Sequence, residues 1–222
     1  MDRFTLYITH KNYSSWSLRI WLLMRVFGID FIEKNVPMTD AGEIPDMRGI
    51  LATSKVPCLI AHLPDGDLAI PESLAIAEFL AEIFTDLRLW PGDISARAKA
   101  RALAAEMHAG FGALRNACPM NLRRPAAPLD VNDAVRADVR RIEGMWQACF
   151  DDPASGGGPF LMGDFSIVDA MYAPVYSRLQ TYQLSNHPAL DRFGAALTAL
   201  PAWQEWTDGA LQDKTIIMAD EL

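Results

Sequence analysis

The sequence predicts an α/β domain followed by an all-helical domain. Strand and helix patterns alternate in the order β-α-β-α-β-β-α over the first 84 residues. A short stretch around Trp90-Pro91-Gly92 then breaks both patterns, and no strand pattern follows it. We therefore expect an α/β domain at residues 1–84, a linker at 85–94 and an all-α domain at 95–222.

The first strand and the first helix have clear patterns. Phe4, Leu6 and Ile8 alternate with polar or aromatic neighbours, which is the two-residue period of a strand. The segment 16–27 is apolar nearly all round and ends at Gly28, a residue that commonly stops helices. Such a helix should be buried between other layers.

The rest of the first domain supplies further strands and helices. A second strand is expected at 31–36 and a short, weak helix at 43–52. Residues 58–63 and 68–70 flank a turn sequence, which predicts a hairpin. An amphipathic helix follows from Glu72. Two strands are reached through helices and two through the hairpin, which favours a mixed sheet covered by helices.

The second domain contains only helix patterns. We expect one long helix over 95–116, another over 130–150 that opens with two aspartates, and a third that begins at Ser166-Ile167-Val168-Asp169. Pro188 and Pro201 each stand where a first helical turn would begin.

Charge and hydropathy exclude several classes of partner. The net charge is −8, and no basic stripe is present to bind a phosphate backbone, so nucleic-acid binding is not expected. No run approaches the ~20 apolar residues that a membrane-spanning helix needs. The N-terminal residues do not resemble a signal peptide. We expect a soluble cytoplasmic protein without membrane contact.

The cysteines and histidines do not predict a metal site. The three cysteines, Cys58, Cys118 and Cys149, include no C-x-x-C pair, and free thiols in a reducing compartment explain them. The four histidines lack metal-ligand spacing.

Three segments, in this order and before a helical half, resemble the cytosolic glutathione S-transferase family. They are Asn12-Tyr13-Ser14-Ser15-Trp16-Ser17-Leu18-Arg19, Lys55-Val56-Pro57-Cys58-Leu59 and Glu72-Ser73-Leu74-Ala75-Ile76. The first is similar to serine-type bacterial members, with some likeness to zeta and theta-like members. The resemblance implies a thioredoxin-like first domain, a helical second domain, glutathione as co-substrate and a homodimer.

The resemblance also assigns site residues. Glutathione would contact Asn12, Trp16, Arg48, Lys55, Val56, Pro57, Glu72 and Ser73, and no metal is implied. Glu72 and Ser73 begin a helix, where free N–H groups and the helix dipole attract a carboxylate. Plain helix capping explains the same two residues and can coexist with binding.

The family's V-P-x-L segment contains a cis proline. Such a bond at Val56-Pro57 would leave the backbone of Val56 free to pair with the cysteinyl unit of glutathione, as an added strand does. A proline at the start of an edge strand is the ordinary alternative. Arg48 or Lys55 would take the glycyl carboxylate.

Thiol activation is assigned to the first loop. A hydroxyl that donates to the sulfur favours the thiolate. By resemblance to serine-type members, spacing back from Gly28 places this hydroxyl at Ser14, with Ser15 second, whereas counting from Arg19 moves the match to Asn12. We expect Ser15 to cap the helix. Simple capping by both serines remains an alternative. No cysteine precedes Cys58, so disulfide-reductase chemistry is not expected.

The second substrate is expected between the domains. Met107, His108, Phe111 and Arg115 form a stripe at helical spacing, and we interpret Met107 as core and His108 and Phe111 as pocket residues. The predicted function is transfer of glutathione to a small electrophile. The alternatives are a glutathione-dependent isomerase of zeta type and a non-catalytic interaction protein with the same fold.

Overall fold

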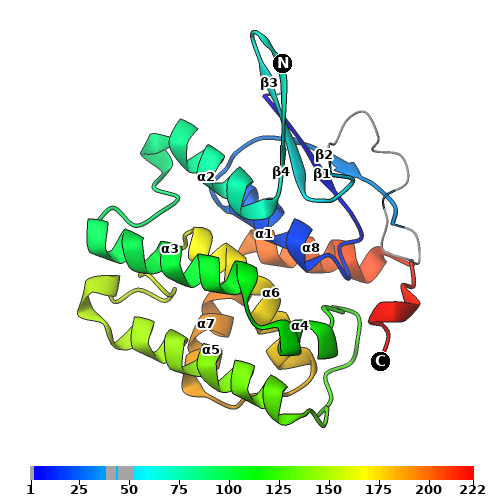
Figure 1. Ribbon diagram of the computed structural model, residues 1–222, viewed down its shortest axis with the longest axis vertical. Helices are drawn as coiled ribbons and strands as arrows, with labels where there is room; N and C mark the ends of the chain where they lie inside the picture. Colours follow the sequence, from blue (N-terminus) through cyan, green and yellow to red (C-terminus); the bar gives the residue numbers. More distant parts are fainter. Residues whose placement is uncertain (1–2, 39–43, 45–52) are drawn as a thin grey trace.

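The computed structural model describes residues 3–38, 44 and 53–222 (Figure 1). The strands gather at one end of the molecule, and the helices that follow residue 93 occupy the other end. The predicted fold class is confirmed: a thioredoxin-like α/β unit precedes an all-helical one.

The sheet has four strands, in the order β2-β1-β3-β4. They are β1 (Phe4–Ile8), β2 (Ile32–Asn35), β3 (Cys58–Leu63) and β4 (Gly66–Pro71). The central strand β1 pairs parallel to β2 and antiparallel to β3, and β3 pairs antiparallel to β4. The sheet is therefore mixed, as predicted. The helix expected at 43–52 lies almost entirely outside the described residues.

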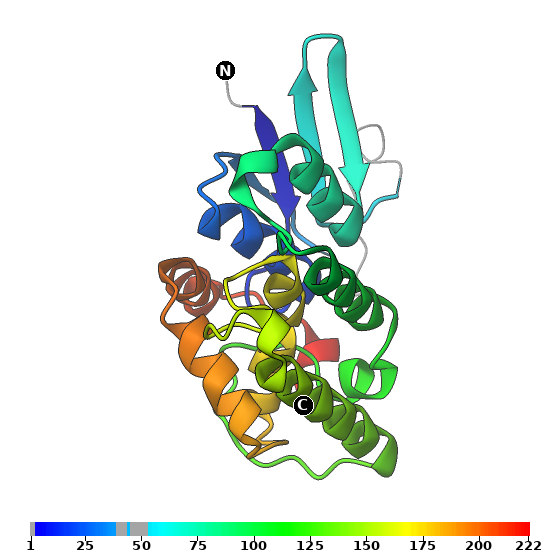
Figure 2. The same cartoon turned by 90° about the vertical axis from the view of Figure 1, so that its left-hand side faces the viewer.

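Two helices pack directly on this sheet and set the position of the site. Helix α1 (Ser15–Val26) is buried along most of its length, and the chain leaves it through Gly28, at a φ of +64°. Only glycine adopts this conformation without strain. Helix α2 (Ser73–Ile83) packs against α1 and the β3–β4 hairpin. Figure 2 shows this hairpin extending beyond the helices.

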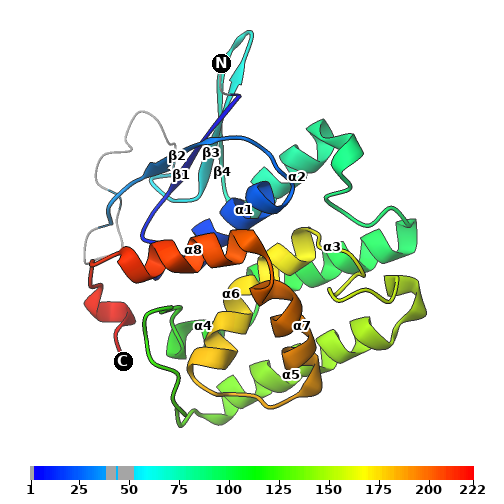
Figure 3. The same cartoon turned by 180° about the vertical axis from the view of Figure 1, so that it is seen from behind.

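The helical part is organised around one buried helix. Its helices are α3 (Ile94–Ala109), α4 (Gly112–Ala117), α5 (Asp133–Asp151), α6 (Ile167–Thr181), α7 (Pro188–Thr198) and α8 (Pro201–Gln212). Helix α6 is buried nearly all round and contacts α1, α3 and α7. Helix α8 lies beside α1 (Figure 3). Because α6 touches α1, the second half of the chain supports the helix that begins at the predicted catalytic loop.

The single helix predicted over 95–116 is two helices. Phe111 takes a left-handed conformation, at a φ of 55°, and breaks the helix there. A Cβ atom at Gly110 would lie 2.7 Å from the carbonyl oxygen of Glu106, so this close turn requires glycine. The sequence predicts Asp130 and Asp133 as the caps of α5, but Asn132 is the N-cap and accepts from the backbone N–H of Val135.

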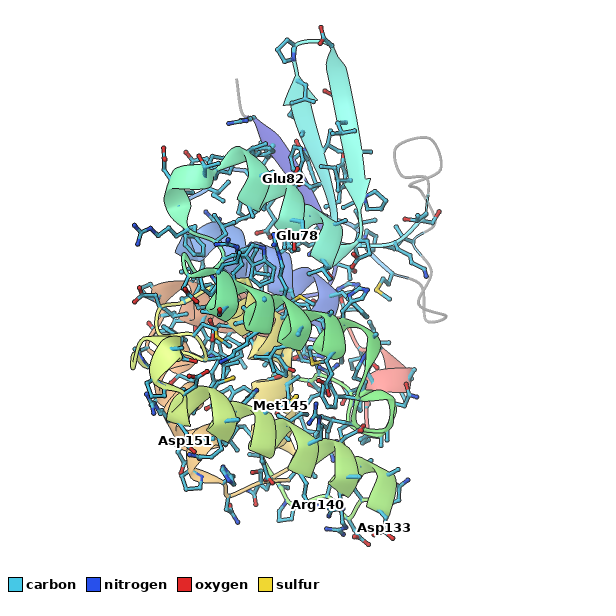
Figure 4. All side chains as sticks on the ribbon, turned by 60° about the vertical axis from the view of Figure 1, so that its left-hand side comes forward. Glu78, Glu82, Asp133, Arg140, Met145 and Asp151 are labelled. Carbon is cyan, nitrogen blue, oxygen red and sulfur yellow. The ribbon has the colours of Figure 1, made fainter. Side chains whose placement is uncertain are left out.

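Side-chain hydrogen bonds to one carboxylate join α2 to α3. The carboxylate of Glu78 on α2 accepts from the indole N–H of Trp90 and from the guanidinium of Arg101 on α3. Figure 4 shows Glu78 on α2 above α3, with α5 on the far side of α3. Trp90 lies in the stretch predicted as a linker, so this stretch is fixed to both neighbouring helices.

None of the helices in the described part of the chain combines the length and the apolar character that a membrane-spanning segment requires.

Candidate functional site

A cavity of about 680 Å³ opens where the two parts of the chain meet. Its walls come from the loop before α1, the segment before β3, the start of α2, the end of α3 and the C-terminal segment. This volume suits a small organic ligand. The predicted site residues that line it are Ser14, Ser15, Trp16, Lys55, Val56, Pro57, Glu72, Ser73 and His108.

Three predicted residues are not among those lining the cavity. Asn12 is fully buried, and its amide group donates to Asn121 while its oxygen accepts from the backbone N–H of Arg123. It therefore ties the first loop to the loop after α4. Phe111 is buried in the core at the break between α3 and α4. Arg48 lies outside the described residues.

The two serines at the start of α1 have different partners. Ser14 is the N-cap: its oxygen accepts from the N–H of Ser17 at 3.3 Å, and its hydroxyl donates to Ser17 Oγ at 2.8 Å. Ser15 Oγ accepts from Nη2 of Arg178 on α6, at 3.2 Å. The expectation that Ser15 caps this helix is therefore wrong, since Ser14 has that position.

The start of α2 is held in an unusual backbone conformation. Glu72 has a φ of 88° and a ψ of 130°, which is costly for a residue with a side chain and is concentrated at functional sites. Its carboxylate accepts from the N–H groups of Leu74 and Ala75 and from the hydroxyl of Ser73. Burial acts to raise the pKa of Glu72, but these bonds and nearby His108 lower it overall. The carboxylate is thus ionised and placed at the helix N-terminus.

The segment before β3 reaches the same cavity. The Val56–Pro57 peptide bond is cis, as the family resemblance implies. Lys55, Val56 and Pro57 all line the cavity, directly before the first residue of β3. The segment therefore brings the backbone of Val56 and the ammonium group of Lys55 to the same cavity as the starts of α1 and α2.

His108 connects the second half of the chain to the start of α2. Its Nδ1 lies 3.4 Å from Oε1 of Glu72, too poorly aligned for a hydrogen bond, and this buried nitrogen has no other partner among the described residues. Its ring meets the ring of Trp16 edge-on, with centroids 5.4 Å apart. A ligand held at Glu72 would therefore lie beside His108.

Two arginines that the sequence did not single out for the site surround Trp16. The guanidinium carbons of Arg19 and Arg115 lie 4.2 and 4.8 Å from the centroid of its ring. Burial, together with the charges of Arg178 and Arg115, lowers the pKa of Arg19 to about 9. The Arg19 guanidinium therefore remains charged at neutral pH. Trp16 lines the cavity, whereas Arg19 and Arg115 are not among its lining residues.

The C-terminal segment forms a wall of the cavity that no local sequence pattern predicts. Ile217 and Asp220 line the cavity, and burial raises the pKa of Asp220. His10 Nδ1 is bonded to Asp213 at 3.0 Å, which anchors the segment to the first loop. The hydroxyl of Tyr13 is bonded to Glu221, so it faces this segment.

Among the residues at 3–38, 44 and 53–222, no group of three or more histidine, cysteine, aspartate or glutamate side chains is arranged to hold a metal ion.

Comparison with known proteins supports one family for this cavity and fold. The model of the glutathione S-transferase N-terminal domain matches residues 13–83. A probable maleylacetoacetate isomerase of Vibrio cholerae is 30% identical over 152 residues, which cover 66% of this chain and 70% of that protein. A probable maleylacetoacetate isomerase of Caenorhabditis elegans is 28% identical over 200 residues, covering 89% of this chain and 90% of that protein.

Solved structures share the fold at lower identity. The crystal structure of a maleylacetoacetate isomerase from Anaeromyxobacter dehalogenans, with bound dicarboxyethyl glutathione and citrate, superposes with a TM-score of 0.68. The alignment covers 97% of this chain and 96% of that one, at 23% identity. The matched domain, the Vibrio relative and the shared fold agree, and this chain belongs to the glutathione S-transferase family.

Proposed function

We propose that the cavity binds glutathione and that the protein uses its thiolate to catalyse a cis–trans isomerisation. One observation carries this proposal: three separate segments, at the starts of α1, β3 and α2, meet at one cavity. Each segment offers the group that one part of glutathione needs. The names of the Vibrio and Caenorhabditis relatives favour isomerisation over conjugation.

The γ-glutamyl end would bind at the start of α2. The Ser73 hydroxyl and the N–H groups of the first turn suit its carboxylate, and the ionised carboxylate of Glu72 suits its ammonium. Without ligand, Glu72 itself accepts from Leu74 and Ala75. Binding would therefore shift the Glu72 carboxylate from the helix end toward the ammonium group.

The remainder of glutathione would extend past Val56 toward α1. The backbone of Val56 would pair with the cysteinyl unit, and Lys55 would attract the glycyl carboxylate. This direction brings the sulfur to the start of α1, where the dipole and the serine hydroxyls favour a thiolate.

The isomerisation requires only this thiolate. Maleylacetoacetate contains a cis double bond conjugated to a carbonyl group. Addition of the thiolate forms a C–S bond and moves the π electrons onto the carbonyl oxygen as an enolate. The former double bond then rotates, and collapse of the enolate expels the thiolate and leaves the trans alkene. Glutathione is regenerated, and the ammonium group of Lys55 and the ring nitrogens of His10 and His108 lie at the cavity, where they suit the substrate's carboxylates.

Proton NMR of one reaction mixture tests this proposal. The protein is mixed with maleylacetoacetate and with glutathione at one-hundredth of the substrate concentration. We expect complete conversion to the trans isomer with glutathione unchanged. Stoichiometric loss of glutathione into a stable thioether would favour conjugation instead, and no change in the substrate or in glutathione would favour the non-catalytic alternative.

We also propose that the protein is a homodimer. Leu63 and Leu68 on the β3–β4 hairpin and Ile94 at the start of α3 are large apolar side chains exposed by 38%, 42% and 72%. A second copy that covers the hairpin edge and α3 would bury them. Light scattering at micromolar concentration should give twice the chain mass, and a monomeric mass would contradict the proposal.

A further inference from the structure

Arg178 on α6 is buried and holds three partners. Its Nε donates to the carbonyl of Cys118, its Nη1 to the carbonyl of Pro174 and its Nη2 to Oγ of Ser15. The first two bonds fix the guanidinium within the helical half. The third extends to the loop that lines the cavity, so α6 is connected directly to the start of α1.

This bond leaves the hydrogen of Ser15 available. A guanidinium only donates, so the oxygen of Ser15 accepts from Arg178 and its own hydrogen must find another acceptor. This hydrogen has no acceptor among the described residues, and Ser15 lines the cavity. The hydroxyl of Ser14, by contrast, already donates to Ser17. Ser15 is therefore the serine at this helix start whose hydroxyl is free to donate to a ligand.

The arginines near Ser15 form no ion pair with a carboxylate in the described part of the chain. The charges of Arg178 and Arg115 help to lower the pKa of Arg19, and the charge of Arg115 helps to lower that of Arg178, which falls to about 10, mainly through burial. In the described part of the chain, the arginines that pair with carboxylates are others, such as Arg101 and Arg141. Nε and Nη1 of Arg19 have no hydrogen-bond partner there either. An anion at the start of α1 would be stabilised by this charge.

We propose that Arg178 is a positioning residue for thiol activation: it orients the Ser15 hydroxyl to donate to the sulfur of bound glutathione. Arg19 and Arg115 add unpaired positive charge behind Trp16. The thiol proton leaves to solvent, and the resulting thiolate accepts from Ser15. This inference rests on the proposed binding of glutathione and assigns the contact with the sulfur to Ser15 in place of Ser14.

Other charged or titratable groups also line the cavity, and the substitutions described below leave them in place. His10, Lys55 and His108 favour an anion in the cavity when they are protonated, whereas Glu72 and Asp220 oppose it. The charge of Glu72 acts to raise the pKa of Arg19, and the charge of Asp220 acts to raise the pKa of Arg178. A shift caused by these groups would be the same in all the variants compared below, since none of the substitutions removes them.

The experiment is a double-mutant cycle that measures the thiol pKa of bound glutathione. Thiolate absorbance near 240 nm is titrated against pH for the wild type, Ser15→Ala, Arg178→Gln and the double variant. We expect each single substitution to raise the thiol pKa of bound glutathione by about one pH unit. The double change should raise it by little more than either one, because Arg178 acts through Ser15.

Three further variants separate positioning from general charge and from folding. Arg115→Gln removes charge without touching Ser15, so its smaller shift should add to that of Ser15→Ala. Arg178→Lys keeps the charge and the ability to donate, and should recover part of the shift if Arg178→Gln folds poorly. Arg140→Gln, on the outer face of α5 (Figure 4), should leave the thiol pKa unchanged.

The possible results divide clearly. Additive shifts for Ser15→Ala and Arg178→Gln, in variants that still bind glutathione, would overturn the positioning role. The same holds for a thiol pKa that Arg178→Gln and Arg178→Lys leave unchanged. A wild type that does not bind glutathione in a calorimetric titration would instead reject the proposed function on which the inference rests.

Discussion

Two helix starts in this protein use the same residue types for different purposes. At α6, Ser166 and Asp169 form a capping box, with Asp169 fully buried and bonded to Ser166 and to the N–H of Leu161. At α2, Glu72 and Ser73 also satisfy backbone N–H groups, but Glu72 is partly exposed and lines the cavity.

The pKa values of the two carboxyl groups are consequently shifted in opposite directions. Burial raises the pKa of Asp169 to about 7, against the hydrogen bonds that it accepts. At Glu72 burial is partial, and the hydrogen bonds and His108 lower the pKa in spite of it. Serine and an acid at a helix start therefore indicate a cap in both cases. Exposure to a cavity and a strained backbone distinguish the start that can bind a ligand.

The largest expected effect is on stability, from Asp169→Asn. An amide cannot accept from both Leu161 and Ser166, so at least one buried donor loses its partner. The free energy of unfolding should fall by about 3 kcal/mol, beyond the usual range for a cap. Urea denaturation measures it, and glutathione affinity of the folded variant should be unchanged. A loss below about 0.5 kcal/mol would show that this cap is dispensable.

The pH dependence of that loss has a definite sign. The folded pKa of Asp169 lies above its usual value, so its contribution to stability is complete at acidic pH and decreases as pH rises toward 7. Asp169→Asn should therefore cost more at pH 5 than at pH 8. A cost that does not change between pH 5 and 8 would mean that the buried carboxyl is ionised throughout this range.

The next effect separates the two serines at α1. Ser15→Ala should lower kcat/KM by about ten- to a hundredfold near pH 7, and the loss should shrink at pH 9, where the thiol ionises unaided. Ser14→Ala should instead lower the free energy of unfolding by about 1 kcal/mol, because Ser14 is the cap. If Ser14→Ala shows the pH-dependent kinetic loss and Ser15→Ala does not, the two roles are exchanged.

The smallest effect concerns Glu72. Its folded pKa is below its usual value, so its contribution to stability is present above about pH 4.5 and is lost as pH falls through the folded pKa. Because Glu72 is partly exposed, the change should be small. Urea midpoints of the wild type and Glu72→Gln should converge between pH 5 and 3. A difference that stays constant over this range would assign the effect of Glu72 to packing.

Local sequence signals predicted most of the fold. The two-residue period of β1, the turn between β3 and β4, and the prolines that begin α7 and α8 each act over a few residues, so they can be read from the sequence. The break at Gly110 and Phe111 was missed because helical spacing continues across it. A close backbone approach and a left-handed residue cause that break.

Most of the predicted residues that line the cavity belong to short motifs, and His108 follows from helical spacing. Glu72, Ser73 and the Val56–Pro57 pair fall in such motifs, and they reach one cavity. The bond from Arg178 to Ser15 joins residues 163 positions apart, and His10 meets Asp213 across 203 positions. These contacts depend on how α6 and the C-terminal segment pack, which no local pattern encodes.

The most direct test of this account is a calorimetric titration of glutathione into the wild type and the Glu72→Ala, Ser73→Ala double variant. Glu82→Ala serves as the control, since Glu82 is an exposed acid on the same helix (Figure 4). We expect the double variant to stay folded and to lose at least tenfold in affinity, about 1.4 kcal/mol, while Glu82→Ala binds as the wild type does. Equal affinity in a folded double variant would contradict the account and would move the γ-glutamyl site away from the start of α2.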